Sequence, residues 1–333
     1  MARSLQVFEE TFPIAGSFTI SRGSRTEIHV MVAEITDGAH RGRGECVPYA
    51  HYGESLVSVR QQIEGMMDLI TGGGTRADLN RAMAPGAARN ALDCALFDLE
   101  AKRAGRRVWE LAELAELSNA APPPDMITAY TLSLGSAAEM GKAAQGAKDR
   151  ALLKLKLGGE GDLERVGAVR RGAPKARLIV DANEAWSPEM VRSYSAALAD
   201  LGVELIEQPL PKGKDGMLAE IPHPVPICAD ESCHVSADLA ALAGRYDLVN
   251  IKLDKSGGLT EALIMAKQAK RLGLGIMVGC MLGTSLAMAP AMLLASLADF
   301  VDLDGPLLLA KDRAAALVYR DSYVAAPTAE LWG

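Results

Sequence analysis

Five short apolar runs, each ending in a charged residue, recur at a nearly constant interval along the second half of the chain. They end at Lys156, Asp181, Glu207, Asp230 and Lys252, and the intervals between these ends are 25, 26, 23 and 22 residues. One interval holds a strand, a helix and two loops. A chain that repeats this unit forms a parallel barrel, with its active site at the carboxyl ends of the strands. We therefore expect all five charged side chains to meet around one cavity.

The three acidic residues at these ends predict a metal site. Asp181, Glu207 and Asp230 each follow β-forming apolar residues. Any one of them alone is more readily explained as a helix N-cap or as a partner in a loop salt bridge. Three carboxylates at the same position of successive units would repel one another unless a cation lay between them. Because oxygen ligands suit Mg²⁺, we expect Mg²⁺ here, with Asn183 projecting the same way to support the site.

Two lysines precede the first of these carboxylates. Lys154 and Lys156 alternate with leucines, so they share one face of a strand. A solvated strand face is the ordinary explanation for lysines at this spacing. Here the leucines would pack on helices and the lysines would point into the barrel, where a paired cation and a metal lower the pKa of one lysine. A lysine with a lowered pKa can remove a proton near neutral pH.

The fifth run predicts a second lysine base. Lys252 shares the inward face of its strand with Asn250, whereas Asp254 and Lys255 begin the following loop. A surface lysine at a strand end is the alternative. We prefer Lys252 over Lys255 because of its shared face with Asn250.

The last apolar run ends in two aspartates, Asp302 and Asp304, that lie on one face of a strand. One explanation is that Asp304 only opens a turn with Gly305. The functional explanation is that the two carboxylates bind an ammonium group.

Residues 123–308 are expected to form the barrel, because strand-like and helix-like segments alternate throughout this region. The expected strands lie near 127–132, 152–157, 177–181, 203–207, 226–230, 247–252, 275–280 and 299–302. The segments 187–202 and 259–273 are amphipathic and end in glycine, as helices do.

Residues 1–122 are expected to form a separate first domain, because consecutive prolines at 121–125 interrupt regular structure and mark a boundary. Its expected elements are strands over 4–12, 27–36 and 42–49 and a helical stretch over 55–118. The segment 14–25 is rich in glycine and serine, and we expect it to be a mobile loop or lid. Residues 309–333 are expected to be irregular and to pack back on the first domain.

Composition excludes several classes of protein. The 35 basic and 42 acidic residues give a net charge of −7 without a basic block, which argues against nucleic-acid binding. No apolar stretch reaches the length of a membrane span, and the first residues lack the core of a signal peptide. The five cysteines have no zinc-site or CxxC spacing, so we expect free thiols in a cytoplasmic protein. The oligomeric state is left open, with a homo-oligomer as one option.

Several motifs, taken in order, resemble the enolase superfamily, muconate lactonizing enzyme subgroup. They are KLK (154–156), IVDAN (179–183), IEQP (206–209), ADES (229–232), NIKLDKSGG (250–258) and, in the capping domain, ALDCALFDLEAK (91–102). Within the subgroup, DLDGP (302–306) resembles the Asp-x-Asp element of L-Ala-D/L-Glu epimerase-like dipeptide epimerases. The resemblance implies an α/β fold, a modified TIM (β/α)7β-type barrel with an α+β capping domain completed by the C-terminal segment.

The resemblance also implies roles for the candidate residues. Mg²⁺ would be held by Asp181, Glu207 and Asp230, with Lys156 and Lys252 as acid and base on opposite faces of the substrate α-carbon. The implied substrate contacts are Lys154 for the terminal carboxylate, Asp302 and Asp304 for the ammonium group, Arg25 (with Arg22 as its rival) for the distal carboxylate of a glutamyl side chain, and Thr131 as a further candidate.

The expected function is Mg²⁺-dependent epimerisation at the C-terminal residue of a dipeptide, most simply L-Ala-D/L-Glu, in peptidoglycan peptide metabolism. An N-acylamino-acid racemase or an o-succinylbenzoate synthase would share the chemistry, but their substrates lack the ammonium group that Asp302 and Asp304 would bind. A catalytically silent barrel that only binds a ligand is the alternative from another class. Loss of a lysine or a metal ligand would favour it, and none is missing.

Overall fold

The computed structural model describes residues 3–111 and 121–333, and an eight-stranded sheet lies at its centre. The strands are β5 (Tyr130–Leu132), β6 (Leu152–Lys156), β7 (Arg177–Asp181), β8 (Val203–Glu207), β9 (Ile227–Ala229), β10 (Leu248–Ile251), β11 (Gly275–Val278) and β12 (Phe300–Val301). Each strand pairs in parallel with the next one in the chain. All eight predicted barrel strands are therefore present.

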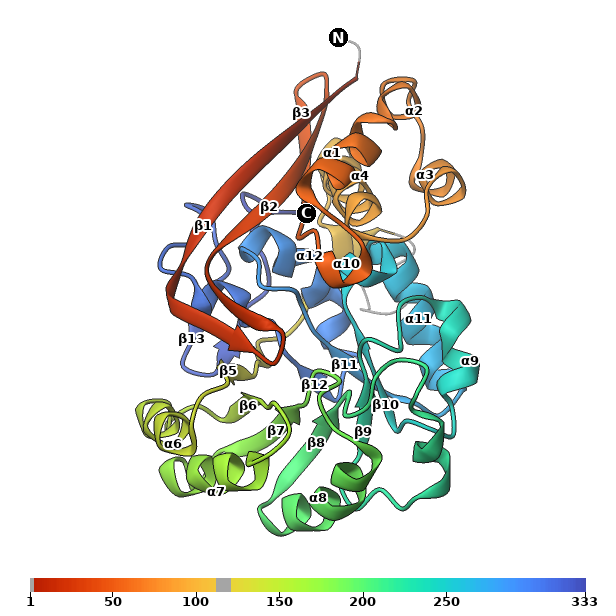
Figure 1. Ribbon diagram of the computed structural model, residues 1–333. Coiled ribbons are helices and arrows are strands. Elements are labelled where there is room, and N and C mark those ends of the chain that lie inside the picture. Colours follow the sequence, from red (N-terminus) through yellow and green to blue (C-terminus); the bar gives the residue numbers. More distant parts are fainter. Residues whose placement is uncertain (1–2, 112–120) are drawn as a thin grey trace.

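The sheet curls until its first and last strands meet (Figure 1). The backbone N–H of Ala129, just before β5, donates to the carbonyl oxygen of Val301 in β12 at 2.8 Å. Helices connect the strands: α6 (Ala137–Gly146), α7 (Asp162–Gly172), α8 (Pro188–Asp200), α9 (Leu239–Leu242), α10 (Leu253–Ser256), α11 (Leu259–Arg271) and α12 (Ser285–Ala295). Between β8 and β9 stands only the 3-10 helix η3 (Gly216–Glu220). The predicted modified (β/α) barrel is confirmed.

Strand β6 shows how the barrel separates its apolar and charged residues. Leu153 and Leu155 belong to the large core that includes the surrounding helices. Leu152 instead packs in a small cluster with one residue from each of β7 to β11, a layer inside the barrel. Lys154 and Lys156 share the face of Leu152, so they point inward above this layer, as the alternation of the strand predicts.

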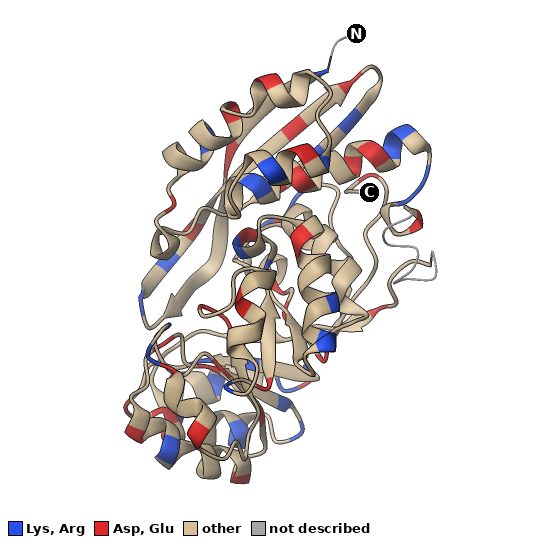
Figure 2. Ribbon diagram, turned by 90° about the vertical axis from the view of Figure 1, so that its right-hand side faces the viewer, with Lys and Arg blue, Asp and Glu red and all other residues tan. Residues whose placement is uncertain are grey.

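The N-terminal part of the chain forms an antiparallel sheet of β1 (Ser4–Ile20), β2 (Gly23–Asp37) and β3 (His40–Cys46). Four helices, α1 (Leu56–Glu64), α2 (Met67–Thr71), α3 (Arg76–Ala82) and α4 (Ala87–Ala104), lie beside it (Figure 2). Two glycines of β3 let α4 approach closely. A Cβ atom on Gly44 would lie 2.1 Å from the carbonyl oxygen of Ala91, and one on Gly42 would lie 2.1 Å from that of Ala95.

The prediction of a loop at 14–25 is wrong. These residues continue β1 and β2 as a long hairpin whose tip lies at Ser21 and Arg22 (Figure 1). The strands shift register between Pro13 and Phe18 and then pair again from Phe18 to Ile20. The glycine and serine content suggested a loop, but the β-forming residues after the shift restore the ladder.

The C-terminal segment is more regular than predicted. It contains the hairpin of β13 (Tyr319–Arg320) and β14 (Tyr323–Val324), which pairs with β4 (Met126–Ile127). Ile127, expected at the start of the first barrel strand, therefore belongs to this separate sheet. Near the end of the chain, the indole N–H of Trp332 donates to the carbonyl oxygen of Cys94 in α4 at 3.0 Å.

Short 3-10 helices occur at η1 (Ala50–Tyr52), η2 (Val108–Glu110), η4 (Ser236–Asp238) and η5 (Gly305–Leu308). Part of the helical stretch predicted over 55–118, residues 112–118, lies outside the described residues. The domain boundaries at 122 and 308 stay a prediction. Over the described ranges, no helix has both the length and the apolar character needed to cross a bilayer.

Candidate active site

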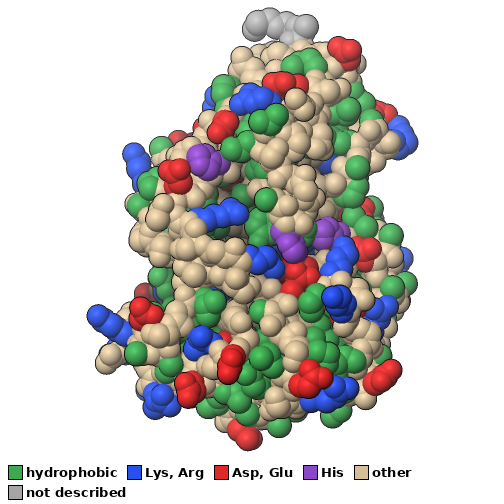
Figure 3. Space-filling model, viewed as in Figure 1, with side chains coloured by type: hydrophobic (Ala, Val, Ile, Leu, Met, Phe, Trp, Pro, Cys, Tyr) green, Lys and Arg blue, Asp and Glu red, His purple; other side chains and the backbone are tan. Residues whose placement is uncertain are grey.

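A cavity of about 500 Å³ lies where the hairpin tip meets the carboxyl ends of the barrel strands. The hairpin contributes Phe18, Arg22 and Arg25 to its wall, and the loop after β3 contributes Tyr49. In Figure 3, basic, acidic and histidine side chains gather on the face where these two parts of the molecule approach each other. The cavity is therefore enclosed jointly by the N-terminal sheet and the barrel.

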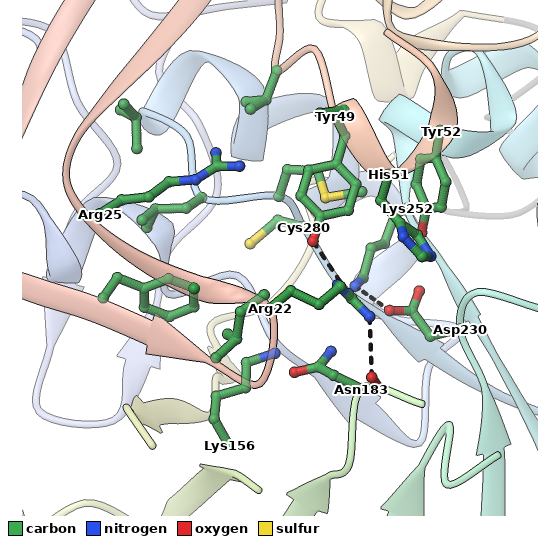
Figure 4. A pocket seen from close by; sticks show the side chains of 18 of the residues that line it. Arg22, Arg25, Tyr49, His51, Tyr52, Lys156, Asn183, Asp230, Lys252 and Cys280 are labelled. Carbon is green, nitrogen blue, oxygen red and sulfur yellow. Dashed lines mark hydrogen bonds and ion pairs between the residues drawn. The ribbon is translucent and has the colours of Figure 1, made fainter. Parts of the chain in front are cut away.

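Two lysines line this cavity from opposite sides of the barrel (Figure 4). Lys156 ends β6 and Lys252 follows β10, and these strands are four places apart in the eight-stranded order. Lys156 Nζ lies 2.5 Å from Asp181 Oδ2, and Lys252 Nζ lies 2.6 Å from Asp230 Oδ2. The structure thus brings both predicted lysines to one cavity, each beside a different carboxylate.

Lys154 lies deeper in the barrel, with a side chain that is 1% exposed. Its Nζ donates to Asp302 Oδ2 at 2.7 Å and lies 2.6 Å from Glu207 Oε2, although the second contact lacks hydrogen-bond geometry. Burial disfavours its charge, but these carboxylates and Asp181 outweigh burial and hold the pKa of Lys154 well above its usual value. Lys154 is therefore a buried cation that joins two groups of acidic side chains.

The three predicted metal ligands are buried and lie on neighbouring strands or just after them. Burial raises the pKa of Glu207, and the nearby charge of Asp181 raises it further. Burial alone would also raise the pKa of Asp181, but Lys156 and Lys154 lower it to about 2. Glu207 Oε1 accepts a hydrogen bond from Asn250 Nδ2 at 2.7 Å.

Asp230 is held by two lysines. Lys252 donates to its Oδ2, and Lys255 donates to its Oδ1 at 2.6 Å and to its carbonyl oxygen at 2.6 Å. Although burial opposes ionisation, the two lysines hold the pKa of Asp230 well below its usual value. Lys255 donates hydrogen bonds to this carboxylate and to the carbonyl oxygen of Asn250. It does not line the main cavity. The preference for Lys252 over Lys255 agrees with this geometry.

The expected lowering of the pKa of one lysine in the Lys154–Lys156 pair does not occur at Lys154. Burial disfavours the charge of Lys252, but Asp230 and Glu207 outweigh it and place its pKa well above the usual value. Lys154 behaves in the same way. The sequence-based prediction considered only the neighbouring cations. In the structure, carboxylates lie close to the amines and have the larger effect on their pKa.

The donor set fits a hard divalent cation chemically, because it offers three buried carboxylates, from Asp181, Glu207 and Asp230, that raise one another's energy. In the described parts of the chain, no group of three or more histidine, cysteine or acidic side chains is arranged as a metal site. The lysine ammonium groups instead contact the carboxylate oxygens that a cation would need. The residue types fit Mg²⁺, while their placement here is that of an ion-pair network.

A small cavity of about 30 Å³ adjoins the main one, and Asp302 and Asp304 line it together with Thr131. Burial and the charge of Asp302 raise the pKa of Asp304 to about 7. Within the described residues, Asp302 Oδ1 is buried without a hydrogen-bond partner. Phe18 and Cys280 line both cavities. The two aspartates therefore face a compartment that opens next to the lysines.

The two candidate arginines have different surroundings in the structure (Figure 4). Arg22 is paired, with its Nη2 2.8 Å from Glu231 Oε1. The side chain of Arg25 makes no hydrogen bond or ion pair with any described residue, and its guanidinium lies 5.9 Å from the centre of the Tyr49 ring. Of the two, Arg25 is the one with free donors facing the cavity.

Comparison with known proteins places this arrangement in a family. Residues 135–330 match the model described as enolase C-terminal domain-like, and residues 2–112 match the N-terminal domain of mandelate racemase and muconate lactonizing enzyme. The chain belongs to the enolase superfamily. Its lysines and carboxylates at the carboxyl ends of the barrel strands thus lie in an enolase-superfamily fold.

Relatives of this enolase-superfamily chain include the L-Ala-D/L-Glu epimerase of Escherichia coli strain K12, which is 47% identical over 322 residues (95% of this chain and 98% of that protein). The N-acetyl-D-glutamate racemase of a Pseudoalteromonas species is 44% identical over 306 residues (91% of this chain and 95% of that protein).

Among solved structures, an enolase family member from Agrobacterium tumefaciens with homology to dipeptide epimerases is 54% identical, with a TM-score of 0.96 over 99% of this chain and 100% of that one. It was solved with bound sodium, L-Ala-L-Glu and an ordered loop. Structures of other dipeptide epimerases with this fold contain Mg and a dipeptide.

Sequence reasoning missed several residues of this enolase-superfamily site. Tyr49, at the start of η1, and His51 and Tyr52, within η1, line the main cavity, as does Glu231. The aromatic and histidine residues of PYAHYGE were a usable signal, because segments that connect regular elements often carry binding residues. Glu231 gave no signal beyond its place after Asp230, since its partner Arg22 lies 209 residues away.

Proposed function

We propose that this protein is an Mg²⁺-dependent dipeptide epimerase that inverts the α-carbon of the C-terminal residue, with L-Ala-D/L-Glu as the preferred substrate. The observation that carries the proposal is the placement of Lys156 and Lys252 on strands four places apart, facing one cavity. Two bases on opposite sides of a substrate can remove a proton from one face of a carbon and return one to the other. The identity to L-Ala-D/L-Glu epimerase supports this choice.

In the proposed reaction, one lysine enters as the neutral amine and takes the α-proton of the C-terminal residue. The carboxylate charges of Asp230 and Glu207, which otherwise hold the pKa of Lys252 high, would be offset by Mg²⁺ bound to them. The opposite lysine, protonated at Nζ, then delivers a proton to the other face of the same carbon. Either lysine can start, because the reaction runs in both directions between the two epimers.

Asp181, Glu207 and Asp230 would hold Mg²⁺. When bound, the cation would supply positive charge where the substrate carboxylate gains negative charge as the α-proton leaves. Asn250 would keep Glu207 in place through its hydrogen bond of 2.7 Å. Lys154, a buried cation next to Glu207 and Asp302, would add positive charge beside the same substrate carboxylate.

Substrate recognition would use groups at the two ends of the cavity. Asp302 and Asp304 would bind the free ammonium group of the dipeptide in the small compartment, with Thr131 as a neighbour. Arg25 would bind the distal carboxylate of a glutamyl side chain, because its donors are free and face the cavity.

An N-acylamino-acid racemase is the second candidate, and the N-acetyl-D-glutamate racemase relative favours it. Its substrate keeps the glutamyl side chain and the α-carboxylate but replaces the ammonium group with an amide. Two aspartates facing the small compartment suit a cation better than an acetyl group, so the dipeptide is preferred. An o-succinylbenzoate synthase and a silent binding protein have no comparable support.

A panel of substrates in deuterated buffer with Mg²⁺ tests the proposal. The panel holds Ala-Glu, Ala-Gln, Ala-Leu, Ala-Lys and N-acetylglutamate, and mass spectrometry measures the gain of one deuterium. We expect fast labelling of Ala-Glu. Labelling of N-acetylglutamate alone would instead establish the racemase, and labelling of only apolar or basic dipeptides would remove the role given to Arg25.

We further propose a cytoplasmic location and a role in peptidoglycan peptide metabolism. All five cysteines are free, which suits a reducing compartment. The metabolic role is supported by the proposed substrate, a dipeptide of alanine and glutamate. Nucleic acid is not expected as a partner at a net charge of −7, and a homo-oligomer stays a prediction.

A further inference from the structure

Several contacts fasten the tip of the β1–β2 hairpin to the barrel, among them the backbone N–H of Leu134, which donates to the carbonyl oxygen of Thr19 at 2.9 Å. The side chain of Arg22 makes the largest number of these contacts (Figure 4). Its Nη1 donates to the carbonyl oxygen of Asn183 at 3.0 Å and lies 3.4 Å from Glu184 Oε2. Its Nη2 donates to the hydroxyl oxygen of Tyr49 at 3.1 Å and to Glu231 Oε1 at 2.8 Å. One guanidinium therefore joins the hairpin to the loops after β7, β9 and β3.

Glu231 is the partner that gives this contact its strength. Its side chain is 1% exposed, and Arg22 is its only ion-pair partner among the described residues. Its other oxygen, Oε2, is buried without a hydrogen-bond partner in the described parts of the chain. Lys252 also favours the charge of Glu231, but of the two cations only Arg22 contacts the carboxylate, and a buried carboxylate that loses its ion-pair partner is destabilised. The hairpin tip thus supplies Arg22 as the ion-pair partner of Glu231, a buried carboxylate of the barrel.

The loop that receives Arg22 has a constrained backbone. Asn183 and Glu184 have φ angles of 44° and 67°, in the left-handed region that non-glycine residues seldom adopt. Glu184 is also held from two other sides, 2.9 Å from His51 Nε2 and 2.8 Å from the backbone N–H of Lys212. The acceptors for Arg22 are therefore fixed independently of the hairpin.

The same hairpin tip carries groups that face the cavity. Phe18 and Arg25 stand on either side of Arg22 in the sequence, on the two strands of the hairpin, and both line the cavity wall. Thr19 and Ser24 pair across the strands, so a movement of the tip would move both cavity residues together. The attachment of Arg22 therefore helps to hold Arg25 over the cavity, together with the backbone contacts of Thr19 to Leu134 and Ser133.

We propose that Arg22 and Glu231 form a latch that positions the hairpin, so that Arg22 is a positioning residue and Arg25 alone contacts the distal carboxylate of the substrate. The assignment of Arg25 rests on the proposed function, whereas the latch itself does not. Because its donors are occupied by four partners, Arg22 has little capacity left for a ligand.

The first test of the latch needs no substrate. Hydrogen–deuterium exchange of residues 18–25 is measured in the wild-type protein and in the R22Q, R22K and E231Q variants. We expect R22Q to speed hydrogen exchange of the hairpin tip by about tenfold or more, because the loss of one charged hydrogen bond has an effect of that size. E231Q should change it in the same direction, and R22K should lie between R22Q and the wild type. The controls are R25Q and R41Q, because Arg25 is unpaired and Arg41 is an exposed residue of β3.

The second test is kinetic and uses Ala-Glu and its neutral isostere Ala-Gln. A positioning role predicts that R22Q lowers kcat/KM for both dipeptides by a similar factor, whereas R25Q lowers it for Ala-Glu only. The double variant R22Q/E231Q should be little worse than the more severe single variant, since both remove one interaction.

Unchanged exchange at 18–25 in R22Q would overturn the latch. A fall in kcat/KM confined to Ala-Glu in R22Q would make Arg22 a substrate ligand and would overturn the positioning role. If the wild-type protein labelled no substrate at all, the proposed function would fail, but the exchange measurement would still decide whether Arg22 and Glu231 hold the hairpin.

Discussion

The backbone N–H of Thr131 donates to Asp304 Oδ2 at 2.6 Å. This bond links the first strand of the barrel to the turn after the last one, at the wall of the small cavity. Asp304 thus has a structural contact through one oxygen in addition to the ammonium binding proposed for it. Asparagine can keep the structural contact, because its Oδ1 also accepts a hydrogen bond, while it removes the negative charge.

D304N should therefore separate the dipeptide from the acylated amino acid as substrate. We expect the KM for Ala-Glu to rise by about tenfold or more, because the loss of one charged hydrogen bond has an effect of that size. Any residual turnover of N-acetylglutamate should not change to a matching extent. Steady-state kinetics on both substrates measure the effect. D302N serves as a second variant, although it also removes a partner of Lys154. An unchanged KM for Ala-Glu in both variants would remove the ammonium site from this compartment.

Mg²⁺ binding should depend on Glu207 whether or not the protein turns over a substrate. E207Q should weaken Mg²⁺ at least about tenfold, because even residues that only orient a metal ligand have effects of that size. Isothermal titration calorimetry gives the affinity, and the rise in Tm on adding Mg²⁺ gives an independent measure. E64Q, at a half-exposed acid of α1, is the matched control. Equal affinity of wild type and E207Q would contradict the assigned metal site.

Stability should fall with rising pH because of Asp254. Burial raises the pKa of this aspartate to about 7, while the unfolded chain titrates near the usual value of about 3.9. The folded state thus holds a proton that the unfolded state has released, and this contribution is complete below about pH 4 and lost as the pH rises through about 7.

D254N isolates that contribution. Asp254 Oδ1 accepts hydrogen bonds from the backbone N–H of Val47 at 3.0 Å and from Asn90 Nδ2 at 2.9 Å, and an asparagine oxygen can accept both. Urea unfolding at pH 5, 6, 7 and 8 should show a shallower fall in the free energy of unfolding for D254N than for the wild type. Parallel curves would show that Asp254 is ionised in the folded protein throughout this range.

The barrel and its charged residues were predictable because their signal is local. A strand buried on both faces, followed by a charged residue, recurs often enough that Asp181 and Glu207 could be placed at equivalent positions without knowledge of the fold. The observed bounds of β7 and β8 are those predicted. Parallel topology then determines that such residues meet at one edge of the sheet.

The contribution of the N-terminal sheet to the site could not be derived in this way. The segment 14–25 has the composition of a loop, and only pairing across the chain makes it a hairpin. The contact of Arg22 with Glu231 spans 209 residues and follows from how the two parts of the molecule pack. The raised pKa values of Lys154 and Lys252 were not predicted either, because they depend on distances to carboxylates that the order of residues does not contain.

The most direct measurement of the central claim follows α-proton exchange in deuterated buffer for K156A and K252A, starting from each epimer of Ala-Glu separately. If the two lysines serve opposite faces, K156A should stop exchange from one epimer and K252A from the other, and both should lose epimerisation by at least about a hundredfold. If K156A and K252A both exchanged the α-proton of both epimers at the wild-type rate, that result would contradict the account.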